Sequence, residues 1–340
     1  MPSSTKTGVL LINLGSPAAP TPKAIRAYLA QFLSDPMVMD MPWLIRQLIL
    51  RMFILPKRPQ KIAPRYQSIW TDEGAPLIRH TSHLAQRLDA ELGESFLIDW
   101  AMRYGEPSLE KSLKRFNEAN LKELIIIPLF PQYASATTGS VIKEVHRICS
   151  GWSSLPSFTF VSAFFNHPGF LDAFTNRAKP LLERGFDHLL FSFHGLPSSQ
   201  IIKSDSSGKC LQKEGCCAEP DAPARGCYRA QCLATAKALA QRLELKEDCW
   251  SFAFQSRLGR ALWLEPYLAE QVEALAKKGV KRLLVISPSF VADCLETTDE
   301  LGVEMAERFL RLGGEAFALV PSLNDGADWV TALADLVKGV

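Results

Sequence analysis

Three glutamates in the second half of the chain have a residue type and a spacing that suit proton and metal chemistry. Glu296, Glu300 and Glu304 recur every four residues, so on a helix they share one face, about 6 Å apart along the axis. Asp299 adds a fourth carboxylate, and no basic residue lies between Asp293 and Glu304. If this carboxylate row (Glu296, Glu300 and Glu304) is buried, repulsion between the charges raises the pKa of at least one carboxyl group toward neutrality. The row is a candidate proton acceptor, and the alternative is a solvated helix face.

A single histidine, His194, stands where an apolar segment ends. Residues 189–193 are mostly apolar, and Gly195 and Pro197 follow the histidine, which predicts a sharp turn after a strand. A neutral imidazole is a good base near pH 7 and a common ligand of divalent iron or zinc. A lone histidine at a strand end is often only a hydrogen-bonded structural residue. However, His194 on one wall of a cleft and Glu296 on another could hold a metal with coordination positions left open.

Short apolar segments alternate with amphipathic segments along most of the chain. The apolar segments predict strands, and the periodicity of the segments between them predicts helices. Strands that alternate with helices indicate an α/β fold with parallel sheets covered on both faces. The predicted strands are residues 9–14, 96–102, 124–129, 159–164, 189–193, 251–254, 283–286 and 316–320, and the clearest predicted helices are 77–92, 108–120, 232–243 and 266–278.

The two halves of the chain repeat three motifs in the same order. The clearest is Pro-x-Phe followed by Thr-Thr, within residues 128–138 and again within 288–298. The other pairs are residues 10–17 with 189–197, and 100–105 with 252–259. We therefore predict two similar doubly wound domains, and because ligands bind beyond the carboxyl ends of parallel strands, the six segments would converge on one cleft. The predicted domains are residues 1–166 and 167–325, with a C-terminal helix in 326–340 that packs back on the first domain.

The composition excludes several classes of protein. The 340 residues allow two domains, and 47% hydrophobic with 22% charged residues is typical of globular proteins. A formal net charge of +2 predicts no nucleic-acid partner. The sequence contains no G-x-G-x-x-G, Walker A or G-x-S-x-G motif, so nicotinamide, P-loop and hydrolase-elbow chemistry lack their signatures. It also shows neither a signal-peptide core nor an apolar run of about 18 residues, so we expect a cytoplasmic protein without a membrane span.

Residues 41–56 (MPWLIRQLILRMFILP) come nearest to a membrane segment, but Arg46 and Arg51 interrupt them and they are too short to cross a bilayer. They predict one of two structures. The first is a buried helix. The second is an apolar lip that rests on a membrane or receives an apolar substrate, with the arginines at the level of the lipid headgroups.

Five of the eight cysteines lie between Cys210 and Cys232, in a segment rich in loop-forming residues. Structural disulfides are not expected in a reducing compartment. The lack of a C-x-x-C pair disfavours a zinc ribbon, but four loosely spaced thiolates are compatible with an iron–sulfur cluster that would staple the insertion. The alternative is a set of reduced, unpaired thiols. Cys149, Cys249 and Cys294 are interpreted as isolated core or near-core residues.

In the order and spacing of its motifs the chain resembles the ferrochelatases, the enzymes that insert ferrous iron into a porphyrin at the end of haem synthesis. The resemblance covers nearly the whole chain. The segments that carry it are Ile12-Asn13-Leu14-Gly15-Ser16-Pro17, Met102-Arg103-Tyr104-Gly105, Pro131-Gln132-Tyr133, Thr137-Thr138-Gly139, Phe191-Ser192-Phe193-His194-Gly195-Leu196-Pro197, Phe254-Gln255-Ser256-Arg257-Leu258-Gly259, Trp263-Leu264 and Asp293-Cys294-Leu295-Glu296-Thr297.

The resemblance implies two Rossmann-like domains of the chelatase type around a porphyrin cleft. It implies that His194 and Glu296 are catalytic, binding Fe²⁺ and accepting protons, and that Glu300 and Glu304 continue a track for protons or metal. A porphyrin must lose two N–H protons as the metal enters, so a base beside the ring is required. The implied porphyrin-binding residues are Asn13, Leu14, Arg103, Tyr104, Gln132, Tyr133, Trp263 and Phe290.

The resemblance also assigns the apolar and cysteine-rich segments. Residues of about 35–60 resemble the family's porphyrin lip, which implies peripheral contact with the inner face of the cell membrane. Some relatives hold a [2Fe–2S] cluster on internal cysteines, which implies the same for the insertion at about residues 203–232. The expected ligands are Cys210, Cys217, Cys227 and Cys232, with Cys216 as the alternative. The chain departs from the family pattern where Cys227 replaces the Asp-Pro of many relatives and where Cys294 replaces a frequent histidine.

The implied reaction converts protoporphyrin IX and Fe²⁺ to protohaem with release of two protons. The alternatives are a ferrochelatase for coproporphyrin III, a non-catalytic tetrapyrrole or haem carrier, and a sensor of iron or redox state. The presence of both His194 and Glu296 favours an enzyme over a carrier, because binding a planar ligand needs neither a base nor a proton track.

Overall fold

The computed structural model describes residues 6–205, 207–212, 215–218, 222, 226–257 and 261–340. Parts of the predicted cysteine-rich insertion, and Leu258 and Gly259 of the predicted repeat, lie outside the described residues. The chain divides into two compact units. The first unit is Met1–Phe130 with Ala134–Ala163 and Asn324–Val340, and the second is Pro131–Tyr133 with Phe164–Leu323.

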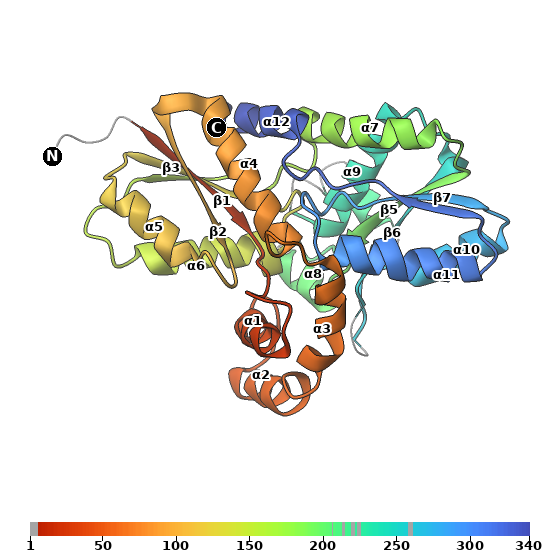
Figure 1. The fold of residues 1–340 in the computed structure, drawn as a ribbon, viewed down its shortest axis with the longest axis horizontal. Coiled ribbons are helices and arrows are strands. Elements are labelled where there is room, and N and C mark those ends of the chain that lie inside the picture. The colour runs from red at the N-terminus through yellow and green to blue at the C-terminus, as the bar shows by residue number, and fades with distance from the viewer. Residues whose placement is uncertain (1–5, 206, 213–214, 219–221, 223–225, 258–260) are drawn as a thin grey trace. The chain divides into compact units, whose positions relative to one another are not determined.

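The first unit is built on a parallel sheet with the strand order β2-β1-β3-β4 (Figure 1). Its strands are β1 (Thr7–Asn13), β2 (Phe96–Met102), β3 (Glu123–Pro128) and β4 (Ser157–Phe160). β1 and β3 are almost continuously apolar because helices cover both faces of the sheet. These helices are α4 (Pro76–Leu92), which continues into the short η2 (Gly93–Ser95), α5 (Leu109–Glu118), α6 (Ser140–Cys149) and α12 (Ala327–Lys338), which packs against α4.

The second unit repeats this topology with the strand order β6-β5-β7-β8, again parallel. Its strands are β5 (His188–His194), β6 (Trp250–Gln255), β7 (Arg282–Ile286) and β8 (Ala316–Leu319). Its helices are α7 (Pro168–Leu182), α8 (Ser198–Ser204), α9 (Tyr228–Arg242), α10 (Leu268–Lys277) and α11 (Ala306–Arg311), with the short turns η4 (Cys216–Ala218) and η5 (Glu247–Cys249).

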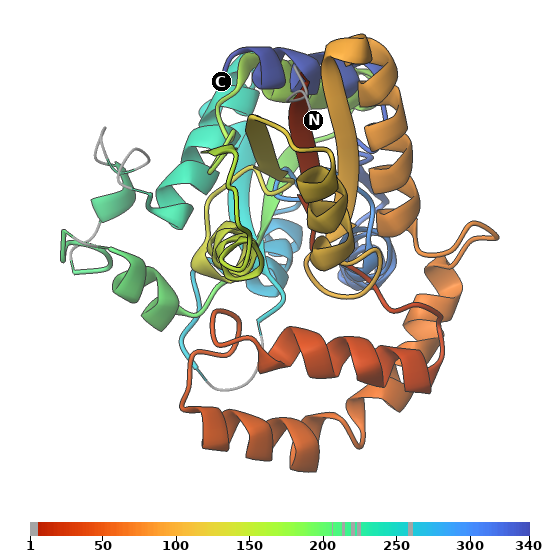
Figure 2. The same cartoon turned by 90° about the vertical axis from the view of Figure 1, so that its left-hand side faces the viewer.

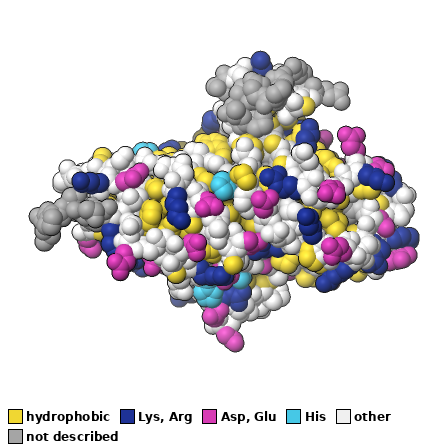
Figure 3. Space-filling view, turned by 90° about the horizontal axis from the view of Figure 1, so that it is seen from above, with side chains coloured by type: hydrophobic (Ala, Val, Ile, Leu, Met, Phe, Trp, Pro, Cys, Tyr) yellow, Lys and Arg dark blue, Asp and Glu magenta, His cyan; other side chains and the backbone are white. Residues whose placement is uncertain are grey.

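The equal strand order of the two sheets confirms the predicted α/β class with a repeated doubly wound topology. All the predicted strands occur, and one of them was predicted too long, since β4 ends at Phe160 and residues 161–164 have left the sheet. Charged side chains of both signs are interspersed with apolar ones on the face drawn in Figure 3, in keeping with the net charge of +2.

Each unit has a glycine at the same place, just beyond its central strand. Gly15 follows β1 with φ of +116°, and a Cβ there would stand 1.8 Å from the carbonyl oxygen of Tyr104. Gly195 follows β5, and its Cβ would stand 2.7 Å from the carbonyl oxygen of Gln255. Only glycine permits such close backbone approach. These turns bring the residues at the carboxyl ends of neighbouring strands together.

The two Thr-Thr motifs of the repeat both lie in π-helices. Thr137 and Thr138 belong to η3 (Ser135–Gly139), and Thr297 and Thr298 belong to η6 (Glu296–Met305). The carboxylate row therefore lies on a π-helix rather than on the α-helix that its four-residue spacing predicts. Hydrogen bonds in a π-helix run from residue i to i+5, and such segments are rare and frequent at functional sites.

A helical extension leaves the first unit at the carboxyl end of its sheet. It consists of α1 (Pro22–Ser34), α2 (Trp43–Ile49), η1 (Leu50–Ile54) and α3 (Arg58–Ile69), with α2 and η1 on the side of α1 away from the sheet (Figures 1 and 2). The apolar side chains of the lip (residues 41–56) that face outward are Trp43, Leu44, Ile45, Leu48, Met52 and Phe53, which are 50–72% exposed. The interpretation of this segment as a buried helix is therefore wrong.

The two arginines of the lip differ from each other. Arg46 is 5% exposed, and its Nη1 donates to the carbonyl oxygens of Met39 and Met41 at 3.3 and 3.0 Å. The predicted headgroup position is therefore wrong for Arg46, which instead ties α2 to the preceding loop, whereas Arg51 is exposed. No helix within the described part of the chain is both long and apolar enough to span a membrane.

Candidate functional site

His194 is the last residue of β5, and its hydrogen bonds fix the state of its ring. Nδ1 lies 2.6 Å from the carbonyl oxygen of Gly195. Because a carbonyl oxygen can only accept, Nδ1 carries the proton and Nε2 keeps its lone pair for a metal or a proton. Burial lowers the pKa of His194 below the ordinary 6.5 and outweighs the opposing effect of the Glu296 carboxylate. The ring is therefore neutral at pH 7.

The main chain of His194 is held from two sides. Its N–H donates to Oγ of Ser289 at 3.2 Å, and its carbonyl oxygen accepts from the Tyr228 hydroxyl at 2.8 Å. Two aromatic side chains that sequence similarity assigns to porphyrin binding lie beside it. The Phe290 ring meets the imidazole edge-on with a centroid distance of 6.2 Å, and the Trp263 ring lies next to Gly195. Both aromatic side chains are partly exposed, so they can present a surface to a planar ligand.

The carboxylate row begins beside His194 and ends at the protein surface. Glu296 is the first residue of η6 and is partly buried, Glu300 is also partly buried, and Glu304 is exposed. A carboxylate oxygen of Glu300 accepts from the Ser256 hydroxyl at 2.9 Å, and the main-chain oxygen of Glu296 accepts from the Gln255 amide at 3.4 Å. The row thus consists of oxygen acceptors spaced from a buried base to solvent, which is an arrangement that can relay protons or bind a hard cation.

Cys294 lies just before the row and is fully enclosed. Burial and the neighbouring Glu296 charge raise the pKa of its thiol well above the ordinary value. It therefore stays a neutral thiol at pH 7.

Two residues of the first unit that the family resemblance assigns to the porphyrin site, Asn13 and Tyr104, have almost no exposed surface. Asn13 ends β1, is 5% exposed, and its Nδ2 donates to Oγ1 of Thr81 at 3.1 Å. Its Oδ1 accepts from the N–H of Leu14 at 2.9 Å, which fixes the turn toward Gly15. Tyr104 is 1% exposed, with its ring tilted against Phe32 at a centroid distance of 5.0 Å.

Asp35, which the sequence analysis did not single out, accepts hydrogen bonds from several side chains of this part of the first unit. Its Oδ2 accepts from Arg103 Nη2 at 2.6 Å, from the Tyr104 hydroxyl at 2.8 Å and from Ser140 Oγ at 2.6 Å. Its Oδ1 accepts from the N–H of Met37 at 2.7 Å. Burial alone would raise the pKa of Asp35, but these hydrogen bonds and the Arg103 charge outweigh burial and lower it. Asp35 also follows α1 directly, so its hydrogen bonds hold the segment between α1 and the lip against the carboxyl end of the sheet.

Gln132 and Tyr133 lie in the tripeptide that belongs to the second unit. Gln132 is 2% exposed, and its Nε2 donates to Oγ1 of Thr235 at 3.0 Å. Its Oε1 is buried without a hydrogen-bond partner among the described residues. The N–H of Tyr133 donates to Oε1 of Gln231 at 2.7 Å. Both residues are thereby tied to α9, and Gln132 retains one acceptor for a ligand or a water molecule.

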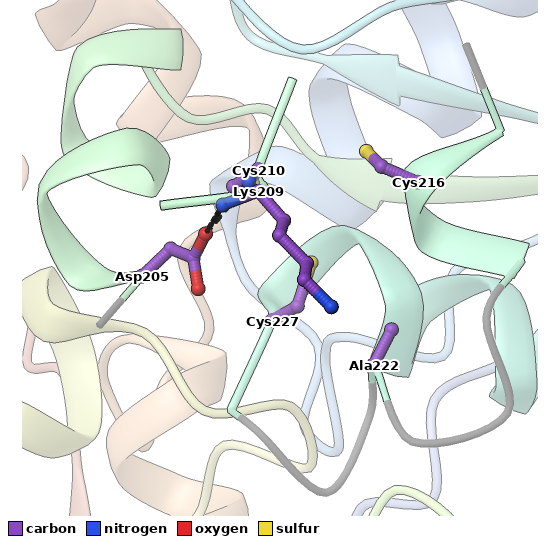
Figure 4. Close-up of a pocket in the computed structure, with 6 residues that line it drawn as sticks. All are labelled: Asp205, Lys209, Cys210, Cys216, Ala222 and Cys227. Carbon is purple, nitrogen blue, oxygen red and sulfur yellow. Dashed lines mark hydrogen bonds between the residues drawn. The ribbon is translucent and has the colours of Figure 1, made fainter. Parts of the chain in front are cut away.

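Four of the five clustered cysteines lie close together. Sγ of Cys216 is 3.7 Å from Sγ of Cys217, which is 3.9 Å from Sγ of Cys227. Cys210, Cys216 and Cys227 line one pocket together with Asp205, Lys209 and Ala222 (Figure 4). The contact with Cys217 lowers the pKa of the Cys227 thiol, against the effect of burial. Cys232, which the sequence analysis included, lies on α9 with 0% exposure and is not among the residues that line the pocket.

The Sγ–Sγ distances of 3.7 and 3.9 Å are close to the roughly 3.8 Å that separates two thiolates on one tetrahedral metal ion, but they join only three of the cysteines. In the described residues, no group of three or more histidine, cysteine, aspartate or glutamate side chains is arranged to hold a metal ion. The cysteine segment therefore offers the donor atoms of a thiolate site without its closed geometry.

A family model for ferrochelatase matches residues 6–339. Curated ferrochelatases from Ectopseudomonas mendocina and Azotobacter vinelandii are 47% and 46% identical over 336 residues, which is 98% of this chain and 98% and 99% of theirs. Among solved structures, the sirohydrochlorin chelatase SirB from Bacillus subtilis subspecies spizizenii in complex with cobalt aligns with a TM-score of 0.54 at 11% identity, covering 98% of this chain and 94% of that one. At that identity the likeness concerns the fold alone.

The Asp35 network predicts a specific pH-dependent loss of stability. Asp35→Asn removes the carboxylate that pairs with the largely enclosed Arg103 side chain, which is 13% exposed, and we expect a fall of about 3 kcal/mol in the free energy of unfolding at pH 7. Because the folded pKa of Asp35 lies below the ordinary 3.8, its contribution is present above that pH and is lost as pH falls through the folded value. The difference between wild type and variant, measured by urea denaturation, should therefore shrink below pH 3.8.

The matched control is Glu106→Gln, whose carboxylate pairs with Lys111 at 2.7 Å in a fully accessible position. Solvent screening limits its expected effect to about 0.5 kcal/mol. An Asp35→Asn variant as stable as this control would show that the network does not stabilise the first unit.

Proposed function

The chain belongs to the ferrochelatase family, and we propose that it inserts Fe²⁺ into protoporphyrin IX to give protohaem and two protons. One observation in the structure supports this most directly. The neutral His194 has Nδ1 committed to Gly195 and Nε2 free, beside the first carboxylate of a row that leads to solvent. A carrier of a planar ligand would need neither feature. A ferrochelatase needs a base to take protons from the pyrrole nitrogens and a route by which protons leave.

In the proposed mechanism the residues of the second unit act on the two substrates as follows. Nε2 of His194 accepts a pyrrole N–H proton or contacts the incoming Fe²⁺, and Glu296 is the second acceptor. Glu300 and Glu304 pass the protons to water, or bring Fe²⁺ along the same oxygens. Trp263 and Phe290 supply aromatic surfaces against which the macrocycle can be held out of plane, which exposes its nitrogen lone pairs. For each turnover two N–H bonds are broken, iron binds the four nitrogens, and two protons are released.

The first experiment is anaerobic insertion of Fe²⁺ by the purified protein, followed by loss of porphyrin fluorescence, with protoporphyrin IX and coproporphyrin III compared. We expect turnover with protoporphyrin. His194→Ala and Glu296→Gln should each lower the rate at least about 100-fold, while the dissociation constant for protoporphyrin stays within about tenfold of wild type.

His146→Ala serves as the histidine control, because His146 is exposed on α6 and its ring lies against Phe158 and Phe160. It should retain the wild-type rate. Preference for coproporphyrin would assign the protein to the other substrate, and porphyrin binding without turnover in the wild type would make it a carrier. A His194→Ala variant that turns over at the wild-type rate would remove His194 from the mechanism.

The lip is proposed to rest on the inner face of the cell membrane, with the protein in the cytoplasm. Six large apolar side chains on two successive helical segments, α2 and η1, are exposed, which is more than isolated surface residues would give. The exposed Arg51 lies among them and the exposed Lys57 follows them, and both cations suit anionic headgroups. Such a surface also suits delivery of the sparingly soluble protoporphyrin rather than the more carboxylated coproporphyrin.

Vesicles of mixed neutral and anionic phospholipid test this surface by co-sedimentation. The double substitution Leu44→Glu and Phe53→Glu should weaken vesicle binding at least about tenfold, because two inserted side chains are replaced by charges. Leu155→Glu, at a similarly exposed leucine outside the lip, should bind as wild type. Equal binding by all three proteins, or none by the wild type, would contradict the proposed membrane contact.

The cysteine insertion is proposed to hold a [2Fe–2S] cluster. The support is the chemistry of the donor set, because Cys210, Cys216 and Cys227 line one pocket and Cys217 contacts Cys216 and Cys227. The pKa of the Cys227 thiol is lowered by its contact with Cys217. We propose these four as ligands, with Cys216 in place of Cys232. The cluster would staple a segment that has little apolar core of its own.

Anaerobically purified protein should then show visible absorption bands and about two iron and two sulfide per chain. Cys227→Ser should lose the bands, whereas Cys249→Ser, which lies outside the insertion, should keep them. A colourless wild-type protein without sulfide would leave the cysteines as reduced thiols. Bands that survive in Cys216→Ser but vanish in Cys232→Ser would restore Cys232 as the ligand.

A further inference from the structure

The dipeptide Gln255-Ser256 at the end of β6 contacts both the histidine turn and the carboxylate row. The carbonyl oxygen of Gln255 accepts from the N–H of Gly195 at 2.9 Å. The Gln255 side chain accepts from Ser192 Oγ at 2.6 Å and donates to the main-chain oxygen of Glu296 at 3.4 Å. Gln255 is 4% exposed and pairs with His194 in the sheet register. This dipeptide therefore reaches each element that carries the proposed chemistry in the second unit.

Ser256 has an unusual backbone conformation at this point. Its φ is +65°, in the left-handed region that serine rarely adopts. Its hydroxyl donates to Oε2 of Glu300 at 2.9 Å. The next residue is held as well, since the guanidinium of Arg257 stacks on the Tyr267 ring at 4.3 Å from its centroid. Strained backbone conformations are concentrated at functional sites, where they fix the direction of a side chain. Here the side chain is the Ser256 hydroxyl, which points to Glu300.

Glu300 is the middle member of the row, between the partly buried Glu296 and the exposed Glu304. A carboxylate side chain without directional contacts can rotate among several positions, and a hydroxyl donor favours one of them. We propose that Ser256 is a positioning residue for iron insertion, and that its left-handed backbone aims the hydroxyl so that Glu300 stays within reach of Glu296 along η6. This inference rests on the proposed function of the carboxylate row.

A purely conformational role for Ser256 is the competing explanation. In that case the bend after β6 would be what matters, and the hydroxyl would be incidental. Only glycine separates the two explanations, because glycine adopts a positive φ without strain. If the bend alone matters, Ser256→Gly keeps the wild-type rate and Ser256→Ala does not. If the hydroxyl matters, both variants lose activity. Asparagine tolerates the same region and carries an amide donor, so it can replace both the backbone conformation and the hydrogen bond.

The experiment compares Ser256→Gly, Ser256→Ala and Ser256→Asn in the full-length protein, using steady-state insertion with Fe²⁺ and protoporphyrin varied separately. Loss of a hydrogen bond to a charged group corresponds to about a tenfold effect. We expect Gly and Ala to lower kcat/KM for Fe²⁺ about tenfold each, with KM for protoporphyrin within about twofold of wild type. Ser256→Asn should recover to within about threefold.

A double-substitution cycle with Glu300→Gln tests whether the two residues act together. If Ser256 acts through Glu300, Ser256→Gly should add less than about a twofold loss in the Glu300→Gln background. Asn120→Ala is the matched control for strain, because Asn120 also has a positive φ, of +49°, at an exposed position after α5. It should lower Tm without changing either KM.

The outcomes distinguish failure of the proposed role of Ser256 from failure of the proposed role of the carboxylate row. Wild-type rates for Ser256→Gly, with Glu300→Gln impaired, would overturn the role of the hydroxyl and leave the carboxylate row in place. Full activity of Glu300→Gln would overturn the role of the row and, with it, that of Ser256. A parallel rise of KM for Fe²⁺ and for protoporphyrin in Ser256→Gly would show general structural damage, and would also overturn the inference.

Discussion

The hydrogen bond from Nδ1 of His194 to the carbonyl oxygen of Gly195 is the interaction on which the rest of the site depends. It places the proton on Nδ1, and burial keeps the ring neutral, so Nε2 is left as a base or a ligand. The turn that makes this bond requires glycine, because a Cβ at position 195 would meet the Gln255 carbonyl oxygen. The close approach of Gly195 to Gln255 thus allows the bond that fixes the tautomer and the direction of the imidazole, and burial sets its charge.

The two units use one topology for different tasks. Leu14 stands before Gly15 in the first unit where His194 stands before Gly195 in the second, so only one copy carries a titratable group at that turn. The π-helices differ in the same way, since η3 spans 5 residues and η6 spans 10 with the carboxylate row on it. In the first unit the residues beyond the strand ends contact Asp35 instead. Asp35 accepts hydrogen bonds from Arg103, Tyr104 and Ser140 and so holds the segment that leads from α1 to the lip. A repeated scaffold therefore carries the histidine and the carboxylate row in one unit and the apolar extension in the other.

The sequence predicted the parallel sheets, the repeat and the strand that leads to His194, because burial on both faces leaves long apolar strands and glycine marks the turns. It did not predict that Tyr104 is enclosed or that Arg46 is turned inward, since both depend on tertiary partners such as Asp35 and the Met39 carbonyl oxygen. Four-residue spacing does not distinguish an α-helix from a π-helix, so the geometry of η6 was missed. Ser256 was missed as well, because its left-handed φ is imposed by neighbours rather than by its own residue type.

The cysteine insertion is linked to His194 by a hydrogen bond from Tyr228, which the sequence motifs did not predict. Tyr228 follows Cys227 directly, begins α9, and donates its hydroxyl to the main-chain oxygen of His194 at 2.8 Å. That bond goes to the backbone, so it restrains the end of β5 whichever rotamer the imidazole adopts. On the other side the N–H of the same residue is held by Ser289, which precedes Phe290. The main chain of His194 is thus held between the start of α9 and the loop that leads to η6. These two bonds fix the position of the residue, whereas the Gly195 carbonyl oxygen fixes the tautomer and burial keeps the ring neutral.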